Sequence, residues 1–128
     1  MSDDKKLLFV VDDDEDLRSS LEDYFNSQGF EVKAIEDGLA VLSQCHTLLP
    51  DLIISDIKMP NLDGVSLMNE LKKREETKNI PVIFMSAYYD DGVMMKAKKL
   101  GAEDFIFKPF EVGRLEKMIN RTFSKKSN

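Results

Sequence analysis

Four short, largely apolar runs predict β-strands that are buried on both faces. They are LLFVV at 7–11, LIIS at 52–55, PVIFMS at 81–86 and FIF at 105–107. Apolar and polar residues do not alternate in these runs, which is typical of strands in a parallel sheet that is covered on both sides. A fifth segment, FEVKAI at 30–35, does alternate and therefore predicts a strand nearer the edge of the sheet.

Between the strands, apolar residues recur at helical spacing and predict five helices. The stripes are Leu17, Leu21, Tyr24 and Phe25; Leu39, Leu42, Cys45 and Leu49; Val65, Met68 and Leu71; Val93, Ala97 and Leu100; and Val112, Leu115, Ile119 and Phe123. Asp14 is the candidate N-cap of the first helix, and Gly29 and Gly101 are candidate stops. Strands and helices therefore alternate, which indicates a parallel sheet between two layers of helices.

The length and composition predict one domain over residues 1–128, with a core at about 6–123 and short disordered tails. The chain is 42% hydrophobic and 33% charged, as is ordinary for a globular protein. No apolar run approaches the ~20 residues of a membrane span. The charged start MSDDKK is unlike a secretory signal. We therefore expect a cytoplasmic protein with no membrane association.

Charge and residue counts exclude several classes of function. The net charge of −6 argues against binding of nucleic acid through this domain. Cys45 is the only cysteine, so the sequence has no internal disulfide and no cysteine-based zinc site. His46 is the only histidine, which excludes a His-rich metal site and disfavours a Ser-His-Asp hydrolase.

Polar side chains collect where the predicted strands end. The first strand runs into Asp12 and Asp13, the third ends in Asp56, the fourth in Ser86, and the fifth is followed by Lys108. In an open parallel sheet these carboxyl ends share one edge, where ligands bind. The topology therefore brings three carboxylates, a hydroxyl and an ammonium group together.

This combination of groups favours phosphoryl transfer. Clustered carboxylates suit Mg²⁺, an ion that often bridges carboxylates and phosphates. A hydroxyl and a lysine beside such an ion complete a phosphoryl-transfer site, and the natural nucleophile is a carboxylate that forms an aspartyl phosphate. Taken singly, each residue has a structural interpretation. Asp14, Glu15 and Asp16 fit a solvated helix start, and an isolated Asp fits a turn or cap.

The motifs together resemble the receiver domain of bacterial two-component response regulators. The matching stretches are VVDDDEDLRSSL, PDLIISDIKMPNLDG, PVIFMSA and GAEDFIFKPF, and the resemblance covers roughly residues 6 to 123. An acidic pair, then D-x-x-M-P-x-x-D-G, then S-A, then K-P-F, form a specific set. The resemblance implies a flavodoxin-like, doubly wound (βα)5 fold with a five-stranded parallel sheet in the order 2-1-3-4-5.

The same resemblance assigns roles at the strand ends. Asp56 is the implied phosphoacceptor. Asp13, Asp56 and the backbone carbonyl of Lys58 are the implied Mg²⁺ ligands, and Asp12 reaches the ion through water. Such a protein is not a conventional enzyme, but it catalyses its own phosphorylation and dephosphorylation. A sensor histidine kinase or a phosphotransfer protein is the expected phosphoryl donor.

The resemblance also implies phosphate contacts and a switch. Ser86, the Ala87 backbone N–H and Lys108 contact the phosphate, and the Lys108–Pro109 peptide bond is cis. Ser86 and Phe105 form the switch, although many members of the family have Tyr where this chain has Phe105.

The loops beside the implied phosphate carry three further residues of interest. Gly64 is expected to relieve backbone strain near Asp63. Lys58 and Tyr88 occupy positions that vary in the family and flank the phosphate. Tyr88 is bulky enough there to slow attack by water.

A downstream protein is expected to bind the face made by the fourth helix, the fifth strand and the fifth helix. The expected contact residues are Met94, Met95, Lys98, Lys99, Glu103, Arg114 and Met118. Exposed methionines adapt well to a partner, but one or two of these three could equally fill the core. Arg114 and Met118 replace the acid and the arginine of the family's usual dimer contacts, so we expect a monomer.

Three alternative functions are weaker. A flavodoxin-like cofactor binder conflicts with DDDED, which would repel a flavin phosphate. A hydrolase with an aspartyl nucleophile usually has D-x-D, whereas this chain has DIK. A degenerate receiver that serves only as a docking module normally lacks an acid, the acceptor or the lysine, all of which are present here. No output motif follows residue 123, so we expect either a protein that acts alone or a fragment of a longer regulator.

Overall fold

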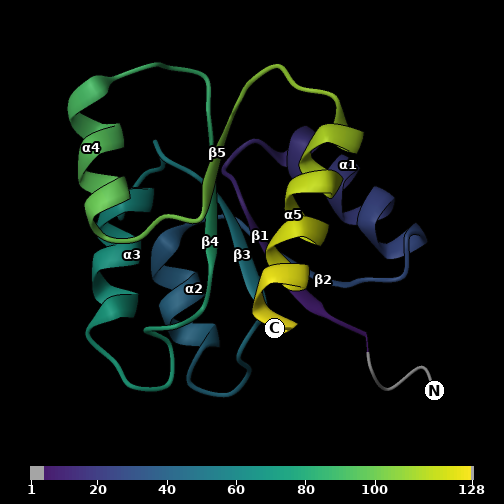
Figure 1. The fold of residues 1–128 in the computed structure, drawn as a ribbon, viewed down its shortest axis with the longest axis horizontal. Helices are drawn as coiled ribbons and strands as arrows, with labels where there is room; N and C mark the ends of the chain where they lie inside the picture. Colours follow the sequence, from purple (N-terminus) through teal and green to yellow (C-terminus); the bar gives the residue numbers. More distant parts are fainter. Residues whose placement is uncertain (1–4, 128) are drawn as a thin grey trace.

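The computed structural model describes residues 5–127 as alternating strands and helices (Figure 1). The elements are β1 (Leu7–Val11), α1 (Glu15–Ser27), β2 (Glu31–Ile35), α2 (Gly38–Gln44), β3 (Leu52–Asp56), α3 (Gly64–Lys72), β4 (Val82–Ser86), α4 (Asp91–Lys99), β5 (Asp104–Phe107) and α5 (Val112–Ser127). The five described strands are parallel in the order β2-β1-β3-β4-β5. The predicted fold, strand order and edge position of β2 are confirmed.

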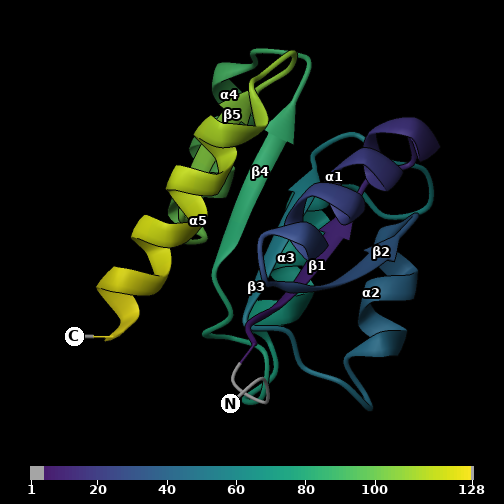
Figure 2. The same ribbon diagram turned by 90° about the vertical axis from the view of Figure 1, so that its right-hand side faces the viewer.

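Helices cover both faces of the sheet, with α1 and α5 on one side and α2, α3 and α4 on the other (Figures 1 and 2). Alternate residues of β1 show why its sequence has no polar positions. Phe9 and Val11 pack in the core under α2 and α3, whereas Leu8 and Val10 pack under α1 and α5. All four side chains are 0% exposed, so a polar residue at any of them would be buried.

The predicted N-cap of α1 and the predicted glycine stops after α1 and α4 are confirmed. The Asp14 side chain caps α1 by accepting hydrogen bonds from the backbone N–H groups of Asp16 and Leu17. Gly29 has a φ of 96° and Gly101 a φ of 95°, and both lie just after a helix. Glycine enters this left-handed region at little cost, which allows the chain to leave each helix and turn back to the sheet.

The predicted apolar stripe of the second helix is confirmed at Leu42 and Cys45 but was wrong at Leu39 and Leu49. Leu39 is 53% exposed and Leu49 is 46% exposed, whereas Gly38, Val41 and Cys45 are buried. At the start of α2, the buried face therefore lies at Gly38, one position before the predicted Leu39. Two close contacts fix this phase. Asp37 caps α2 at the Ala40 N–H, and a Cβ on Gly38 would lie 2.8 Å from a neighbouring backbone oxygen.

Helix α5 extends to Ser127, beyond the point where the sequence predicts a tail at 124–128. Residues 1–4 and 128 of the two predicted tails lie outside the described residues. No helix within the described part of the chain combines the length and the apolar character that crossing a membrane requires.

Candidate functional site

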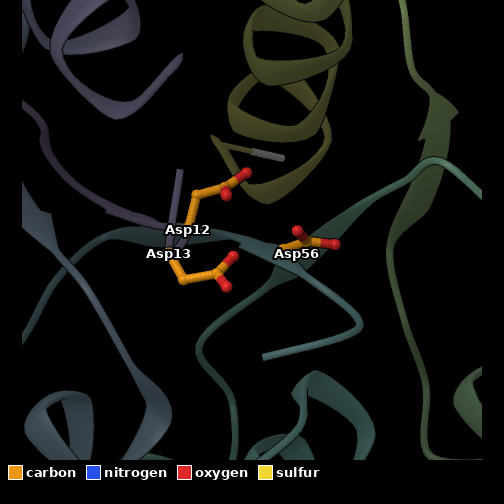
Figure 3. A group of neighbouring side chains, drawn as sticks. All are labelled: Asp12, Asp13 and Asp56. Atoms are coloured by element: carbon orange, nitrogen blue, oxygen red, sulfur yellow. The ribbon is translucent and has the colours of Figure 1, made fainter. Parts of the chain in front are cut away.

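Three aspartates gather at the carboxyl edge of the sheet (Figure 3). Asp12 and Asp13 follow β1, and Asp56 is the last residue of β3. One carboxylate oxygen from each lies within 4.8 Å of the others. Asp12 is buried, Asp56 is 8% exposed, and Asp13 is exposed. The predicted convergence of the strand ends is therefore present at the first and third strands.

Lys108 reaches this cluster from the end of β5. Its Nζ lies 2.8 Å from Oδ2 of Asp12 and 3.0 Å from Oδ2 of Asp56. Lys108 lies 96 positions after Asp12 and 52 positions after Asp56 in the sequence, so only the folded sheet brings the three residues together. The ammonium group of Lys108 is shared between two carboxylates, so the three groups together keep a net negative charge.

The pKa values of Asp56 and Lys108 reflect this shared charge. Burial raises the pKa of the Asp56 carboxyl above its ordinary value; the hydrogen bond from Lys108 opposes that rise, and the charge of Asp12 adds to it. Burial alone would lower the pKa of Lys108, but its hydrogen bonds to Asp12 and Asp56 raise it above the ordinary value. Lys108 is therefore a permanent cation at neutral pH.

Asp12 is held by contacts that leave its side chain little freedom. Its Oδ1 accepts a hydrogen bond of 2.9 Å from the Asp14 N–H, while its Oδ2 accepts from Lys108. Arg18 Nη1 donates to the Asp12 backbone carbonyl at 2.7 Å. Arg18 was not predicted from the sequence. An arginine near the N-terminus of a helix, where the helix dipole disfavours a cation, was the available signal.

Gly64 brings the start of α3 against the end of β3, where Asp56 lies. Its N–H donates to the Ile57 carbonyl at 2.7 Å. A Cβ at this position would lie 2.5 Å from the Asp56 carbonyl oxygen and 2.9 Å from Phe84 Cε1. The predicted role of Gly64 in relieving strain near Asp63 was wrong, because its φ is not positive. Glycine is required here for close approach.

Ser86 is buried at the end of β4, but its hydroxyl is engaged locally. It donates to the Tyr88 carbonyl at 2.8 Å and accepts from the Tyr88 N–H at 3.1 Å. The Lys108 N–H donates to the Ser86 carbonyl at 2.8 Å, which ties the two strand ends together. Ala87 is exposed beside this turn, and Lys58 Nζ lies 5.1 Å from the centre of the Tyr88 ring.

Aromatic side chains surround the rest of this edge. Phe105 is partly buried and packs on Phe84, with ring centres 6.0 Å apart. A second aromatic pair was not predicted from the sequence: the Tyr89 ring, 70% exposed, has its centre 5.7 Å from that of the 42% exposed Phe107. Adjacent tyrosines in a loop were the signal for it. The predicted cis peptide at Lys108–Pro109 is confirmed.

The donor set fits a divalent cation. Three carboxylates carry three negative charges and Lys108 carries one positive charge, so the cluster has a formal charge of −2. Hard carboxylate oxygens are ligands that suit Mg²⁺. Both oxygens of Asp12 already accept hydrogen bonds. Asp13 and Asp56 therefore have more carboxylate oxygens available to coordinate a metal ion.

The chain matches a protein family and several known proteins. Residues 8–120 match the family described as "Response regulator receiver domain". FixJ of Bradyrhizobium diazoefficiens is 38% identical over 88% of this chain and 54% of its own length. Sporulation initiation phosphotransferase F of Bacillus subtilis is 31% identical over 94% of this chain and 96% of its own length.

The chain spans about half the length of FixJ and about a quarter of several other curated relatives. Among solved structures, the receiver domain of the Pseudomonas aeruginosa sensor histidine kinase PA1611 has a TM-score of 0.82. It is 25% identical, and the match covers 91% of this chain and 96% of that one. That structure has a magnesium ion coordinated in its active-site cleft.

Proposed function

This chain belongs to the response regulator receiver family, and on that basis we propose that Asp56 accepts the phosphoryl group that switches it. Receiver domains are phosphorylation-regulated switches of two-component signalling. The observation that carries the assignment is the contact of Asp56 with Lys108, which also binds buried Asp12. The test is phosphorylation by acetyl phosphate with Mg²⁺, measured as the intact mass.

The residues of the site divide the work of phosphoryl transfer. A carboxylate oxygen of Asp56 forms the new bond to phosphorus while the bond to the donor's histidine nitrogen breaks, and the imidazole leaves. Lys108, held as a cation, pairs with the negative charge on the phosphoryl group. The donor is a sensor histidine kinase or a phosphotransfer protein. The same site would catalyse both phosphorylation and dephosphorylation of the domain.

We assign the Mg²⁺ ligands to Asp13, Asp56 and the Lys58 backbone carbonyl, with Asp12 acting through water. The hydrogen bonds at both oxygens of Asp12 support its indirect role. Bound Mg²⁺ would neutralise charge on the phosphoryl oxygens. The carboxylates of Asp12, Asp13 and Asp56 would repel the phosphate of a flavin, which argues against a flavodoxin-like cofactor binder.

Mg²⁺ is expected to raise the free energy of unfolding, because a cation bound only by the folded state stabilises it by mass action. The gain is about 1.4 kcal/mol when the Mg²⁺ concentration is ten times Kd. Asp13→Asn should remove most of it, and Asp16→Asn, on an exposed acid of α1, should not. Thermal melts with and without MgCl₂ measure the effect. An equal response of the wild type and Asp13→Asn would place the ion elsewhere.

We propose that phosphorylation draws the Ser86 hydroxyl away from Tyr88. Both hydrogen bonds that shape the 86–88 turn would break, and Phe105 would turn into the vacated space. Beryllofluoride, a phosphate mimic, should therefore shift the NMR signals of Tyr88 and Phe105 in the wild type. Ser86→Ala should leave Phe105 much less responsive. A Phe105 signal that responds equally in both proteins would refute the coupling.

The face made by α4, β5 and α5 is our proposed binding surface for a downstream protein. Among the expected contact residues, Met118 is 7% exposed and packs in the core, so it is not part of this surface. Met95 is 62% exposed, and the Tyr89–Phe107 pair adds further exposed apolar area. We propose that the protein acts in the cytoplasm as one domain. We expect this domain to bind neither nucleic acid nor a membrane.

The protein is expected to remain a monomer. Glu103 and Asp104, acids of the α4–β5–α5 face, already pair with Lys125 and Arg121 of the same chain at 2.7 and 2.9 Å. Arg114 is exposed and stands where the family's usual dimer contact has an acid. Light scattering should give the monomer mass with and without beryllofluoride. A dimer that Arg114→Glu abolishes would contradict this proposal.

A further inference from the structure

A groove runs between α3 and α4, which lie side by side on one face of the sheet (Figure 1). It consists of two adjoining hollows of about 200 and 380 Å³ that share Val65, Ser66 and Lys96. One end reaches Lys58 in the loop after β3, and the other reaches Leu100 at the end of α4. We call this feature the α3–α4 groove.

The floor of the α3–α4 groove is aliphatic. Val65, Val93 and Leu100 are each partly exposed there, and each packs against the core under the sheet. Ala97 is fully buried, and its small side chain lets α4 lie close to the sheet. Partly exposed apolar side chains along a concave strip can be covered by the apolar side chains of another chain.

The rim of the α3–α4 groove is basic although the protein is acidic. Lys58, Lys96 and Lys99 line it, and none of them forms an ion pair with any described residue. The acid of the lining, Asp63, uses its carboxylate to cap α3 at the Ser66 N–H. In a chain with a net charge of −6, this strip has three lysines and one carboxylate, an excess of positive charge that is complementary to an anionic ligand.

We propose that the α3–α4 groove binds an extended acidic segment of a partner protein. The apolar side chains of the segment would lie on Val65, Val93 and Leu100, and its carboxylates would pair with the rim lysines. Helix α4 has nine residues, about 13 Å at 1.5 Å per residue, which matches about four residues of extended chain. The aliphatic floor offers no ring for base stacking, so the groove favours a peptide over a nucleic acid.

This site adjoins the α4–β5–α5 face, with which it shares Lys99, and it requires no phosphoryl group. Two lysines of α4 separate the alternatives. Lys96 lines both hollows of the α3–α4 groove, whereas Lys98 lines neither. Both are exposed and both lie in the last turn of α4. Replacing either with Glu changes the net charge by the same amount and is unfavourable to the helix dipole in both cases. The pair therefore isolates the effect of the groove.

The test uses the unphosphorylated full chain and two fluorescent probe peptides. In one, Asp or Glu alternates with Leu or Val; in the other, each acid is replaced by Asn or Gln. We expect the acidic peptide to bind and to shift the backbone NMR signals of Val65, Val93 and Leu100. Lys96→Glu should weaken binding about tenfold, and Lys98→Glu by less than about twofold. Added salt should weaken binding to the wild type.

Several outcomes would overturn the proposal. They are absence of binding, equally tight binding of the neutral peptide, NMR shifts confined to other faces, or an equal loss of affinity in the two variants. Melting curves of both variants establish that each is folded. A single-stranded DNA oligomer that binds with the same dependence on Lys96 would identify nucleic acid as the ligand instead. A Lys96-dependent dimer in light scattering would identify a second copy of this chain.

Discussion

Replacing Asp56 with Asn is expected to abolish the phosphoryl adduct that acetyl phosphate and Mg²⁺ form on the wild type. Asn has the shape of Asp, and its amide oxygen can still accept the hydrogen bond from Lys108, so the fold should be retained. The amide lacks the charge that makes a carboxylate a nucleophile and a Mg²⁺ ligand. Intact mass spectrometry should show the adduct fall to background, and EDTA should give the same result on the wild type.

Asp63→Asn is the matched control for this experiment. Asp63 is a second acid in the loop after β3, and it is exposed and caps α3 at the Ser66 N–H. Asn is also a good N-cap, so the helix should begin at the same residue. The control should keep the full adduct. An adduct of equal size on Asp56→Asn, or loss of the adduct in Asp63→Asn alone, would assign the phosphoryl group to another residue.

The sequence predicted the layers and the sheet edge because burial on both faces leaves a direct record in the strands. Phe9 and Val10 face opposite layers and neither can be polar, so LLFVV is interpretable without any tertiary information. The same logic placed Asp12, Asp56 and Lys108 at one edge, since parallel strands present their carboxyl ends together. The structure adds that Lys108 contacts both acids.

Features set by the packing of one element against another were not predictable in the same way. Helix α2 is seven residues long, too short for an apolar stripe to fix its phase, and Leu39 is exposed as a result. Met118 and Met95 are both helical methionines that the sequence does not distinguish, but Met118 packs in the core and Met95 is exposed. The turn that holds the Ser86 hydroxyl on Tyr88 depends on loop geometry, and no periodic pattern records that geometry.

Gly64 illustrates the same limit and leads to the second large effect. Asp56, Ile57 and Gly64 come from the end of one strand and the start of the next helix, and their backbones lie in direct contact. A methyl group on Gly64 would meet the Asp56 carbonyl oxygen at 2.5 Å and Ile57 Cα at 3.1 Å. Both are backbone atoms, so relief requires movement of α3 or of the end of β3, which carries the proposed phosphoacceptor.

Gly64→Ala is therefore expected to lower the free energy of unfolding by about 3 kcal/mol, at the upper end of the usual cost of overpacking. Gly113→Ala is the control, because that glycine lies in α5 and, apart from its neighbours in the helix, no described atom lies within 4 Å of the added Cβ. Alanine is the better helix former, and this variant should be more stable by about 0.5 kcal/mol. Urea unfolding of the three proteins measures both changes. Equal stability of Gly64→Ala and the wild type would show that α3 can move away from the end of β3 without cost.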